Sequence, residues 1–244
     1  MNSIHIIFPV LNEERRIKSG INKTIKFMDE HFAGRYSITI VDNGSTDSTE
    51  QIALDFTKQH TSINYLKLSE RGVGLAFREG IKTNKSDIVG YMDIDISTSL
   101  EYLREADHLF SEQNAQIVNA SRLSKQSKII GRNKLRLLTS NGLRLILKLF
   151  FKMKIDDAVC GFKFFRKETI EKLMDITTET NGWFYCIELM LRAERIGIPI
   201  NELPVTWEDN SDTTVKLGKT ISDYMKNIFR LRKEFRAEGN VKAK

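Results

Sequence analysis

Short apolar runs rich in β-branched residues alternate, in the first half of the chain, with longer segments whose apolar residues recur at helical spacing. This alternation favours an α/β fold, a mostly parallel sheet with helices on both faces. Such sheets bind ligands at the carboxyl ends of their strands, so the polar residues that follow each strand are the candidate site residues. The runs predicted as strands are Ile4–Val10, Ile38–Val41, Asn64–Leu68, Ile88–Met92 and Ile117–Ala120.

The pattern changes after Arg122. A polar basic loop is followed by a predicted helix over about Arg132–Met153, a short apolar run and a second long helix at Trp183–Ile196. The segment Ile200–Trp207 comes next, and a basic amphipathic stretch begins at about Thr220.

Length and composition favour one domain. With 244 residues, 41% of them hydrophobic, the chain can bury a single core, and we expect a domain over residues 1–215 and a tail over 216–244. The sequence shows neither a secretory signal nor an apolar window long enough to span a membrane. Cys160 and Cys186 lack the spacing of a disulfide framework or zinc site, which favours a reducing, cytoplasmic compartment.

The positive charge of the chain is local. The formal net charge is +6, but ten Lys and Arg residues and no Asp or Glu lie between Arg122 and Lys154. Such a stretch attracts phosphates, anionic lipids or nucleic acid, and composition alone does not choose among them.

Carboxylates follow two of the predicted strands. Asp93 and Asp95 come directly after Ile88–Met92, and residues two apart in an extended segment share a face. Such a pair can hold Mg²⁺ or Mn²⁺ and leave positions open for a diphosphate, although a solvated acidic turn is the alternative. Asp42 ends the second strand, where it could accept hydrogen bonds from a base or from ribose hydroxyls.

Five segments follow one another along the chain: Pro9-x-x-Asn12-Glu13, Val41–Asp47, Met92–Ser97, Ser121-Arg122 and Asp157-x-x-Cys160-Gly161-Phe162-Lys163. This ordered set resembles the family 2 glycosyltransferases of GT-A fold, and the similarity spans about Ile4 to Trp207. Four segments, Cys160–Lys163, Glu188-Leu189, Gly197–Ile200 and Glu202–Trp207, are similar to the polyprenyl- and dolichyl-phosphate sugar synthases, especially the dolichyl-phosphate β-glucosyltransferases.

The resemblance implies a donor site for a UDP-sugar. Pro9, Glu13 and Asp42 would line the nucleotide pocket, with Asp42 reading the base. Asp93 and Asp95 would face the ribose, the diphosphate and the metal ion, Mg²⁺ or Mn²⁺, with Asp95 as the more direct ligand.

The resemblance also implies an acceptor site. Ser121 and Arg122 match a Ser-Arg pair that contacts phosphate near the reaction centre, and Asp157 and Lys163 match an acidic and a basic position of the acceptor-side loop. Arg132 is expected to hold the acceptor phosphate together with Ser121, Arg122 and Lys163. The catalytic set is then Asp95, Arg122 and Asp157.

Three segments depart from the family pattern. Arg71–Gly74 stands where Gly-Lys-Gly is usual, and Tyr185-Cys186 precedes Glu188 where Phe-Asp is usual. The loop Ser211–Lys216 matches a Gly-Ser-Lys-like stretch only loosely. These departures bear on the donor sugar and on the contacts of the loop.

The implied reaction is the inverting transfer of a hexose, glucose by resemblance, from UDP to polyprenyl or dolichyl phosphate. A phosphate monoester has its second pKa near ~6, so it is a nucleophile without a base. Arg122 and Arg132 would hold it for in-line attack while a metal ion on Asp95 offsets the charge of the departing UDP. A saccharide hydroxyl, as in polysaccharide or glycan synthesis, would instead need a base, with Asp157 or Glu188 as candidates.

Two basic amphipathic segments bear on localisation. Residues 132, 136, 144, 148 and 152 form a basic ridge beside a leucine stripe, which suits either a helix packed on the sheet or a helix at a membrane interface. Lys216–Lys244 carries nine basic and three acidic residues. We therefore expect peripheral attachment to the cytoplasmic face of a membrane, or a separate membrane-protein partner.

The alternative outside enzymology is a basic protein that binds lipid or nucleic acid. Aromatic residues interleave poorly with the basic residues of Arg122–Lys154, which argues against nucleic acid as a partner.

Overall fold

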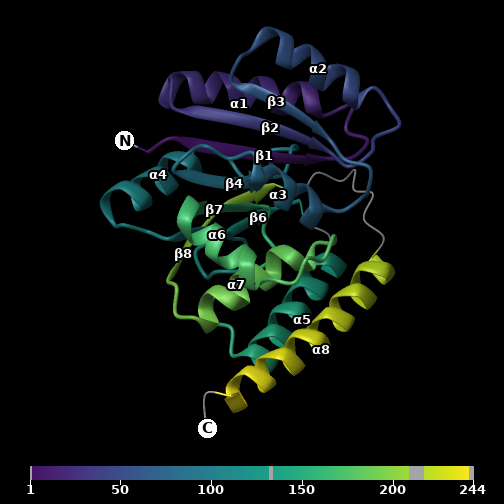
Figure 1. The fold of residues 1–244 in the computed structure, drawn as a ribbon, viewed down its shortest axis with the longest axis vertical. Coiled ribbons are helices and arrows are strands. Elements are labelled where there is room, and N and C mark those ends of the chain that lie inside the picture. Colours follow the sequence, from purple (N-terminus) through teal and green to yellow (C-terminus); the bar gives the residue numbers. More distant parts are fainter. Residues whose placement is uncertain (1, 132–133, 209–216, 242–244) are drawn as a thin grey trace.

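A seven-stranded sheet forms the centre of the computed structural model, which describes residues 2–131, 134–208 and 217–241 (Figure 1). Its strand order is β3-β2-β1-β4-β7-β5-β8, and only β7 runs antiparallel, to its neighbours β4 and β5. The predicted mostly parallel α/β sheet is therefore confirmed. The strands are β1 (Ile4–Val10), β2 (Tyr36–Asp42), β3 (Ile63–Lys67), β4 (Ile88–Met92), β5 (Ile117–Ser121), β7 (Phe162–Arg166) and β8 (Ile200–Pro204).

Helices cover both faces of the sheet, as predicted (Figure 1). Successive side chains of a strand point to opposite faces of the sheet, so the core has two parts. Ile6 and Phe8 of β1 pack toward one layer of helices, and Ile7 packs toward the other. The first layer holds α1 (Ile17–His31), α2 (Thr49–Gln59) and α4 (Tyr102–Glu112); the second holds α3 (Val73–Lys82), α6 (Lys167–Ile176) and α7 (Phe184–Arg195). Beyond α7, α5 (Lys134–Phe151) and α8 (Leu217–Val241) lie side by side.

The segment from residue 200 to 207 is divided between two sheets. β8 ends at Pro204, and β9 (Thr206–Glu208) pairs in parallel with a short strand, β6 (Lys128–Ile130). At the break, the amide of Val205 donates to the carbonyl of Ser121, at 3.1 Å. The small sheet thus holds β9 beside the loop that follows β5.

The C-terminal helix shares the core of the domain. Ile228 and Leu231 of α8 are fully buried beside α7, whereas the boundary expected after residue 215 falls outside the described residues. Both cysteine thiols are free and buried. In the described part of the chain, no helix combines the length and the apolar character that crossing a bilayer requires.

His5 gives the fold a predicted sensitivity to acid. Its ring is 2% exposed, with Nε2 2.8 Å from Thr39 Oγ1 and Nδ1 3.2 Å from Asn84 Oδ1. Burial lowers the pKa of His5 to about 4, although the hydrogen bond to Asn84 opposes the shift. The unfolded chain takes up this proton near pH ~6.5, so the free energy of unfolding should fall by about 2 kcal/mol between about pH 7 and 5.

Urea unfolding of the wild type and of His5→Gln at both pH values measures this term. The variant should lose about 2 kcal/mol less on acidification. An equal loss in both proteins would contradict the assignment to His5.

Candidate active site

The carboxyl ends of β2, β1 and β4 bring the predicted donor residues to one edge of the sheet. Val10 of β1 lies level with Asp42 of β2, and Ile7 lies level with Tyr91 of β4. The loops that carry Glu13, Asp42 and Asp93 therefore begin beside one another. Pro9 lies in β1 with part of its surface exposed.

The acidic turn after β4 has a tightly fixed backbone. The amide of Asp93 donates to Gly161 O at 3.2 Å, and that of Ser97 donates to Asp95 Oδ1 at 3.0 Å. Between them, Ile96 has a φ of 53°, a conformation that β-branched residues rarely adopt. Gly20 of α1 allows the turn to approach, because a Cβ there would lie 2.2 Å from Ile94 O.

Three carboxylates at this edge interact electrostatically. Burial, with repulsion from Asp95 next in size, raises the pKa of Asp93 to about 7, against the attraction of Arg122 and Lys163. Burial also raises the pKa of Glu13, where Arg16 opposes and Asp95 adds to the shift. A cation bound here would lower both pKa values.

Asp93 and Asp95 fit a divalent ion as a partial ligand set. Within residues 2–131, 134–208 and 217–241, no three His, Cys, Asp or Glu side chains gather as a complete metal site. Two carboxylates are the hard oxygen donors that Mg²⁺ and Mn²⁺ prefer, and Mg²⁺ usually keeps its other positions for substrate phosphates and water. These two oxygen donors therefore suit an ion that arrives with a diphosphate.

Asp42 is fully buried and organises its own loop. Its Oδ1 accepts from the amide and the hydroxyl of Ser45, at 2.8 and 2.7 Å, and its Oδ2 accepts from the hydroxyl of Tyr65 at 2.9 Å. Because a carboxylate accepts about four hydrogen bonds, about one position remains. The loop is also joined to the end of β1, since Asn12 N donates to Ser45 Oγ at 2.9 Å.

Arg122 and Asp157 form a buried bidentate pair. Arg122 Nε donates to Asp157 Oδ2 at 2.7 Å and Nη2 donates to Oδ1 at 3.0 Å, with side chains 9% and 1% exposed. Burial alone would raise the pKa of Asp157, but the guanidinium holds it well below its usual range. Trp207 packs its ring 5.5 Å from the guanidinium carbon. Of the five N–H groups of Arg122, this pair uses two.

Two of the remaining predicted acceptor residues, Ser121 and Lys163, are fully buried. Ser121 is fully buried, and its hydroxyl lies 2.7 Å from that of Ser124. Lys163 is also fully buried, and its ammonium donates to Asn119 Oδ1 at 2.7 Å and to Cys160 O at 2.6 Å. Burial lowers the pKa of Lys163. Lys163 thus lies beneath the acceptor-side loop, and Arg132 lies outside the described residues.

The segment from residue 5 to 174 matches the model of glycosyl transferase family 2. The chain belongs to this family.

Curated relatives of this family 2 glycosyltransferase include the glycosyltransferase AglD of Haloferax volcanii, 27% identical over 93% of the chain. The chain spans 36% of the length of that relative. The dolichyl-phosphate beta-glucosyltransferase of Dictyostelium discoideum is 27% identical over 94% of the chain and 73% of its own length. That of Saccharomyces cerevisiae is 28% identical over 88% and 70%.

Solved structures show the GT-A glycosyltransferase fold that the resemblance implied. Glucosyl-3-phosphoglycerate synthase of Mycobacterium tuberculosis, in complex with UDP, aligns with a TM-score of 0.68 at 18% identity, over 95% of this chain and 80% of its own. TarS of S. aureus aligns with a TM-score of 0.64 at 16% identity, over 93% and 64%.

Three residues of this family 2 glycosyltransferase support the site without having been predicted to do so. Asn119 Nδ2 donates to Asp157 O at 2.8 Å, and the Glu202 carboxylate accepts the amides of Asp156 and Asp157 at 2.8 and 3.0 Å. In the sequence, Glu202 and Trp207 belong to a segment of the family resemblance but carry no predicted role. Asn119 stands in a buried strand between Val118 and Ala120, and a polar side chain in such a place is the signal that could have identified it.

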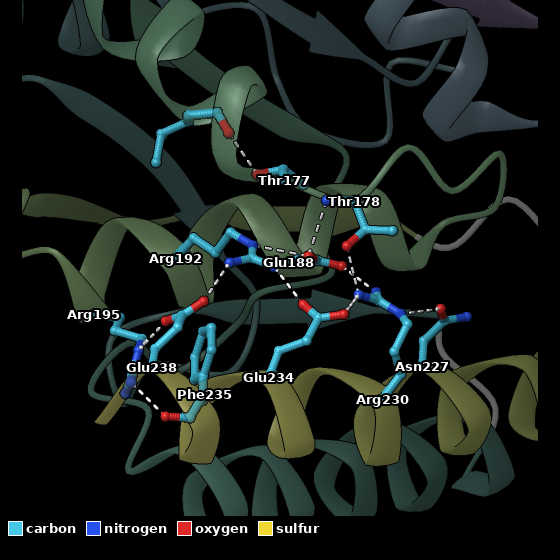
Figure 2. A network of polar contacts seen from close by, with 11 residues as sticks. Thr177, Thr178, Glu188, Arg192, Arg195, Asn227, Arg230, Glu234, Phe235 and Glu238 are labelled. Carbon is cyan, nitrogen blue, oxygen red and sulfur yellow. Dashed lines mark hydrogen bonds and ion pairs between the residues drawn. The ribbon is translucent and has the colours of Figure 1, made fainter. Parts of the chain in front are cut away.

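Glu188, a candidate base for a hydroxyl acceptor, lies in a network of ionic contacts between α7 and α8 (Figure 2). Its carboxylate is fully buried and accepts from Arg192 Nε at 2.8 Å, from the amide of Thr178 at 3.1 Å, and from Arg230. These bonds occupy both oxygens, so the structure supports a structural role for Glu188.

Gly161 gives a direct test of the acidic turn. A Cβ at Gly161 would lie 2.0 Å from Asp93 Oδ2 and 2.3 Å from its Cγ. Gly161→Ala should therefore displace Asp93 and lower the free energy of unfolding by about 1–3 kcal/mol. Gly142→Ala is the matched control, because its Cβ would meet nothing within 4 Å and a helical glycine gains stability as alanine. Equal urea midpoints for the two variants would refute the close contact.

Proposed function

We propose that this chain transfers a hexose, glucose in the first instance, from a UDP-sugar to polyprenyl or dolichyl phosphate, with inversion at the anomeric carbon. The observation that carries the proposal is the buried Arg122–Asp157 pair. The positive charge of Arg122 in this pair is close enough to Asp93 to act on its carboxylate. The names of the relatives from Dictyostelium discoideum and Saccharomyces cerevisiae support this donor sugar and this acceptor.

The donor lies at the ends of β1, β2 and β4. Pro9, Glu13 and Asp42 line the nucleotide pocket, and Asp42 shapes the loop that receives the base while keeping about one acceptor position for it. A divalent ion held by Asp95 and Asp93 would neutralise charge on the diphosphate. The M. tuberculosis synthase binds Mn²⁺ together with UDP, which supports this ion.

The acceptor phosphate binds at Arg122. Asp157 fixes one edge of the guanidinium and Trp207 fixes its face, so the N–H groups that the pair leaves are oriented without further loss of freedom. Ser121 and Lys163 support this arrangement from within, and Arg132 adds charge.

Neither of the two residues considered as a base for a hydroxyl acceptor suits that role, and Asp93, whose pKa burial raises to about 7, is assigned to the proposed metal ion. The pKa of Asp157 lies well below the neutral range in which a general base works efficiently. Both oxygens of Glu188 already accept hydrogen bonds from arginines, so neither is available to take a proton from an acceptor. An acceptor that is already a dianion needs no base. The site therefore suits a phosphate better than a sugar hydroxyl.

A transfer assay with radiolabelled UDP-sugars tests the proposal. The purified chain is offered a polyprenyl phosphate or a free saccharide, with Mn²⁺ or Mg²⁺. Label from UDP-glucose should enter the organic phase only with the lipid phosphate, as the β-linked product of inversion. Label that enters only the saccharide would show the glycan-synthesising alternative instead.

Asp95→Ala should abolish the joint stabilisation of the chain by UDP and Mn²⁺. At a UDP concentration about 100 times the dissociation constant, binding stabilises the wild type by about 2.7 kcal/mol, which raises the melting temperature. Asp55→Ala, which removes an exposed aspartate on α2, should leave this shift unchanged. An undiminished shift in Asp95→Ala would exclude Asp95 from the donor site.

Because the proposed acceptor is a membrane lipid, we expect the chain to act at a membrane surface. We place the chain at the cytoplasmic face, attached peripherally or through a separate membrane protein.

A further inference from the structure

Exposed apolar side chains concentrate on the two outermost helices. Nine large apolar residues in the described part of the chain are strongly exposed, and six of them lie on α5 and α8. The most exposed are Leu138, Leu149 and Leu145, at 70%, 69% and 59%. An apolar surface gathered on adjacent helices marks a binding surface more often than scattered single residues do.

The leucine stripe of α5 faces away from the protein. Leu138, Leu145 and Leu149 recur at spacings of seven and four, so they share one side of the helix, and Leu147, which is buried, lies on the opposite side. The basic ridge expected on this helix is partly turned inward. Lys148 Nζ donates to Asp156 Oδ1 at 2.7 Å, and Arg144 pairs with the same oxygen.

α8 extends the same surface. Its Phe229, 55% exposed, lies 6.0 Å from Phe150 of α5 between ring centroids. Its glutamates point to α7, where Glu234 and Glu238 pair with Arg192 (Figure 2). The exposed basic residues that flank Phe229 along α8 are Lys226, Lys233 and Arg236.

We propose that these two helices dock on an anionic bilayer through an α5–α8 face, with the apolar side chains at the boundary between headgroups and acyl chains. The face comprises Leu138, Leu145, Leu149, Ile221 and Phe229. The inference rests on the proposed function for its choice of surface, because a polyprenyl phosphate acceptor resides in a bilayer.

Charge favours a bilayer over a second copy of the chain. The sequence of α5 contains no Asp or Glu, and the exposed lysines of α8 flank Phe229. Two copies packed face to face would bring these like charges together, whereas anionic headgroups complement them. Exposed leucines with flanking lysines are typical of helices that lie in a membrane interface.

Docking through this face would bring the reaction centre to the lipid. A narrow crevice between α5 and the acceptor-side loop is lined by apolar residues such as Leu143, Leu147 and Val159 and by polar residues that include Arg122 and Asp157. α5 therefore borders the residues proposed to hold the acceptor phosphate, which suits a lipid phosphate whose chain stays in the membrane.

Vesicle co-sedimentation tests the docking face. The full chain is mixed with vesicles of phosphatidylcholine, alone or with phosphatidylglycerol, and the bound fraction is titrated. The variants are the triple change Leu138→Asp, Leu145→Asp, Leu149→Asp, the single change Phe229→Asp, and a matched control, Ile176→Asp, which alters an exposed apolar residue on α6. Urea unfolding checks that each variant folds.

We expect the wild type and the control to bind the anionic vesicles alike. The triple variant should bind at least about 1000-fold more weakly, because about ten-fold or more is lost with each of the three leucines. Phe229→Asp should bind about ten-fold more weakly. Replacing Lys226 and Lys233 by Ala should reduce binding by about five-fold each, and only on anionic vesicles.

Unchanged binding of the folded triple variant and of Phe229→Asp would overturn the proposal. A dimer of the wild type that the triple change dissolves would also overturn it, in favour of a second copy. Transfer to a short, water-soluble prenyl phosphate separates the two hypotheses. The triple variant should retain that transfer, whereas a wild type that docks but transfers no sugar refutes only the proposed function.

Discussion

Arg122→Met is expected to reduce hexose transfer about 10³-fold, because it removes the donors that the acceptor phosphate and the developing charge require. The same change should lower the free energy of unfolding by about 3–5 kcal/mol. It leaves Asp157, whose side chain is 1% exposed, as a buried carboxylate without its guanidinium. Initial rates of label transfer and urea unfolding curves measure the two effects on one protein preparation.

A double-mutant cycle separates the two roles of this pair. Asp157→Asn alone leaves Arg122 with a neutral partner, so it should lower both stability and transfer. The double variant Arg122→Met, Asp157→Asn buries no unpaired charge and should regain stability relative to either single variant. Transfer should stay low in it. Recovery of transfer together with stability would mean that Arg122 only holds the fold.

The sequence predicts strands best where they are buried on both faces. The limits of β1 and β4 agree with their predicted ranges, because every residue but Pro9 in these runs is buried and apolar runs mark such strands well. β6 has three residues, mostly exposed, so no apolar run marks it. The helix α6 was not predicted, although Ile170 and Leu173 carry a helical spacing on its buried side.

In the candidate site, the sequence predicted which residues take part but not the contacts between their side chains. Motif order placed Arg122 and Asp157 in one site, but their bidentate geometry joins residues 35 positions apart and depends on the fold. Asp42 follows a strand as predicted, yet its bonds to Ser45 and Tyr65 depend on how the loop closes. Periodicity alone identifies residues that share a side of a helix and does not say which side faces inward.

α5 is the case in which that ambiguity matters. Its leucine stripe and its basic ridge were both visible in the sequence, and either could have packed on the domain. Asp156, which lies just after the helix, receives Arg144 and Lys148 and turns the ridge inward. Leu147 is buried, so the leucines opposite it remain exposed. One acidic residue in a neighbouring loop thus helps decide which surface the helix presents.

Glu188→Gln is expected to lower the free energy of unfolding by about 3 kcal/mol, because Arg192 and Arg230 lose the buried carboxylate that joins them (Figure 2). Glu234→Gln is the matched control. Glu234 contacts the same two arginines but is 35% exposed, so its loss should lower stability by less than about 1 kcal/mol. Urea unfolding measures both, and hydrogen exchange should show the amides of α8 opening more readily in Glu188→Gln.

Transfer decides between the two roles considered for Glu188. If Glu188 only holds α8 against α7, Glu188→Gln should transfer sugar at the wild-type rate per folded molecule, since glutamine fills the same volume. If Glu188 is the base for a hydroxyl acceptor, the variant should remain stable and lose transfer about 10²-fold or more. That second outcome would contradict both the structural role of Glu188 and the proposed phosphate acceptor, which needs no base.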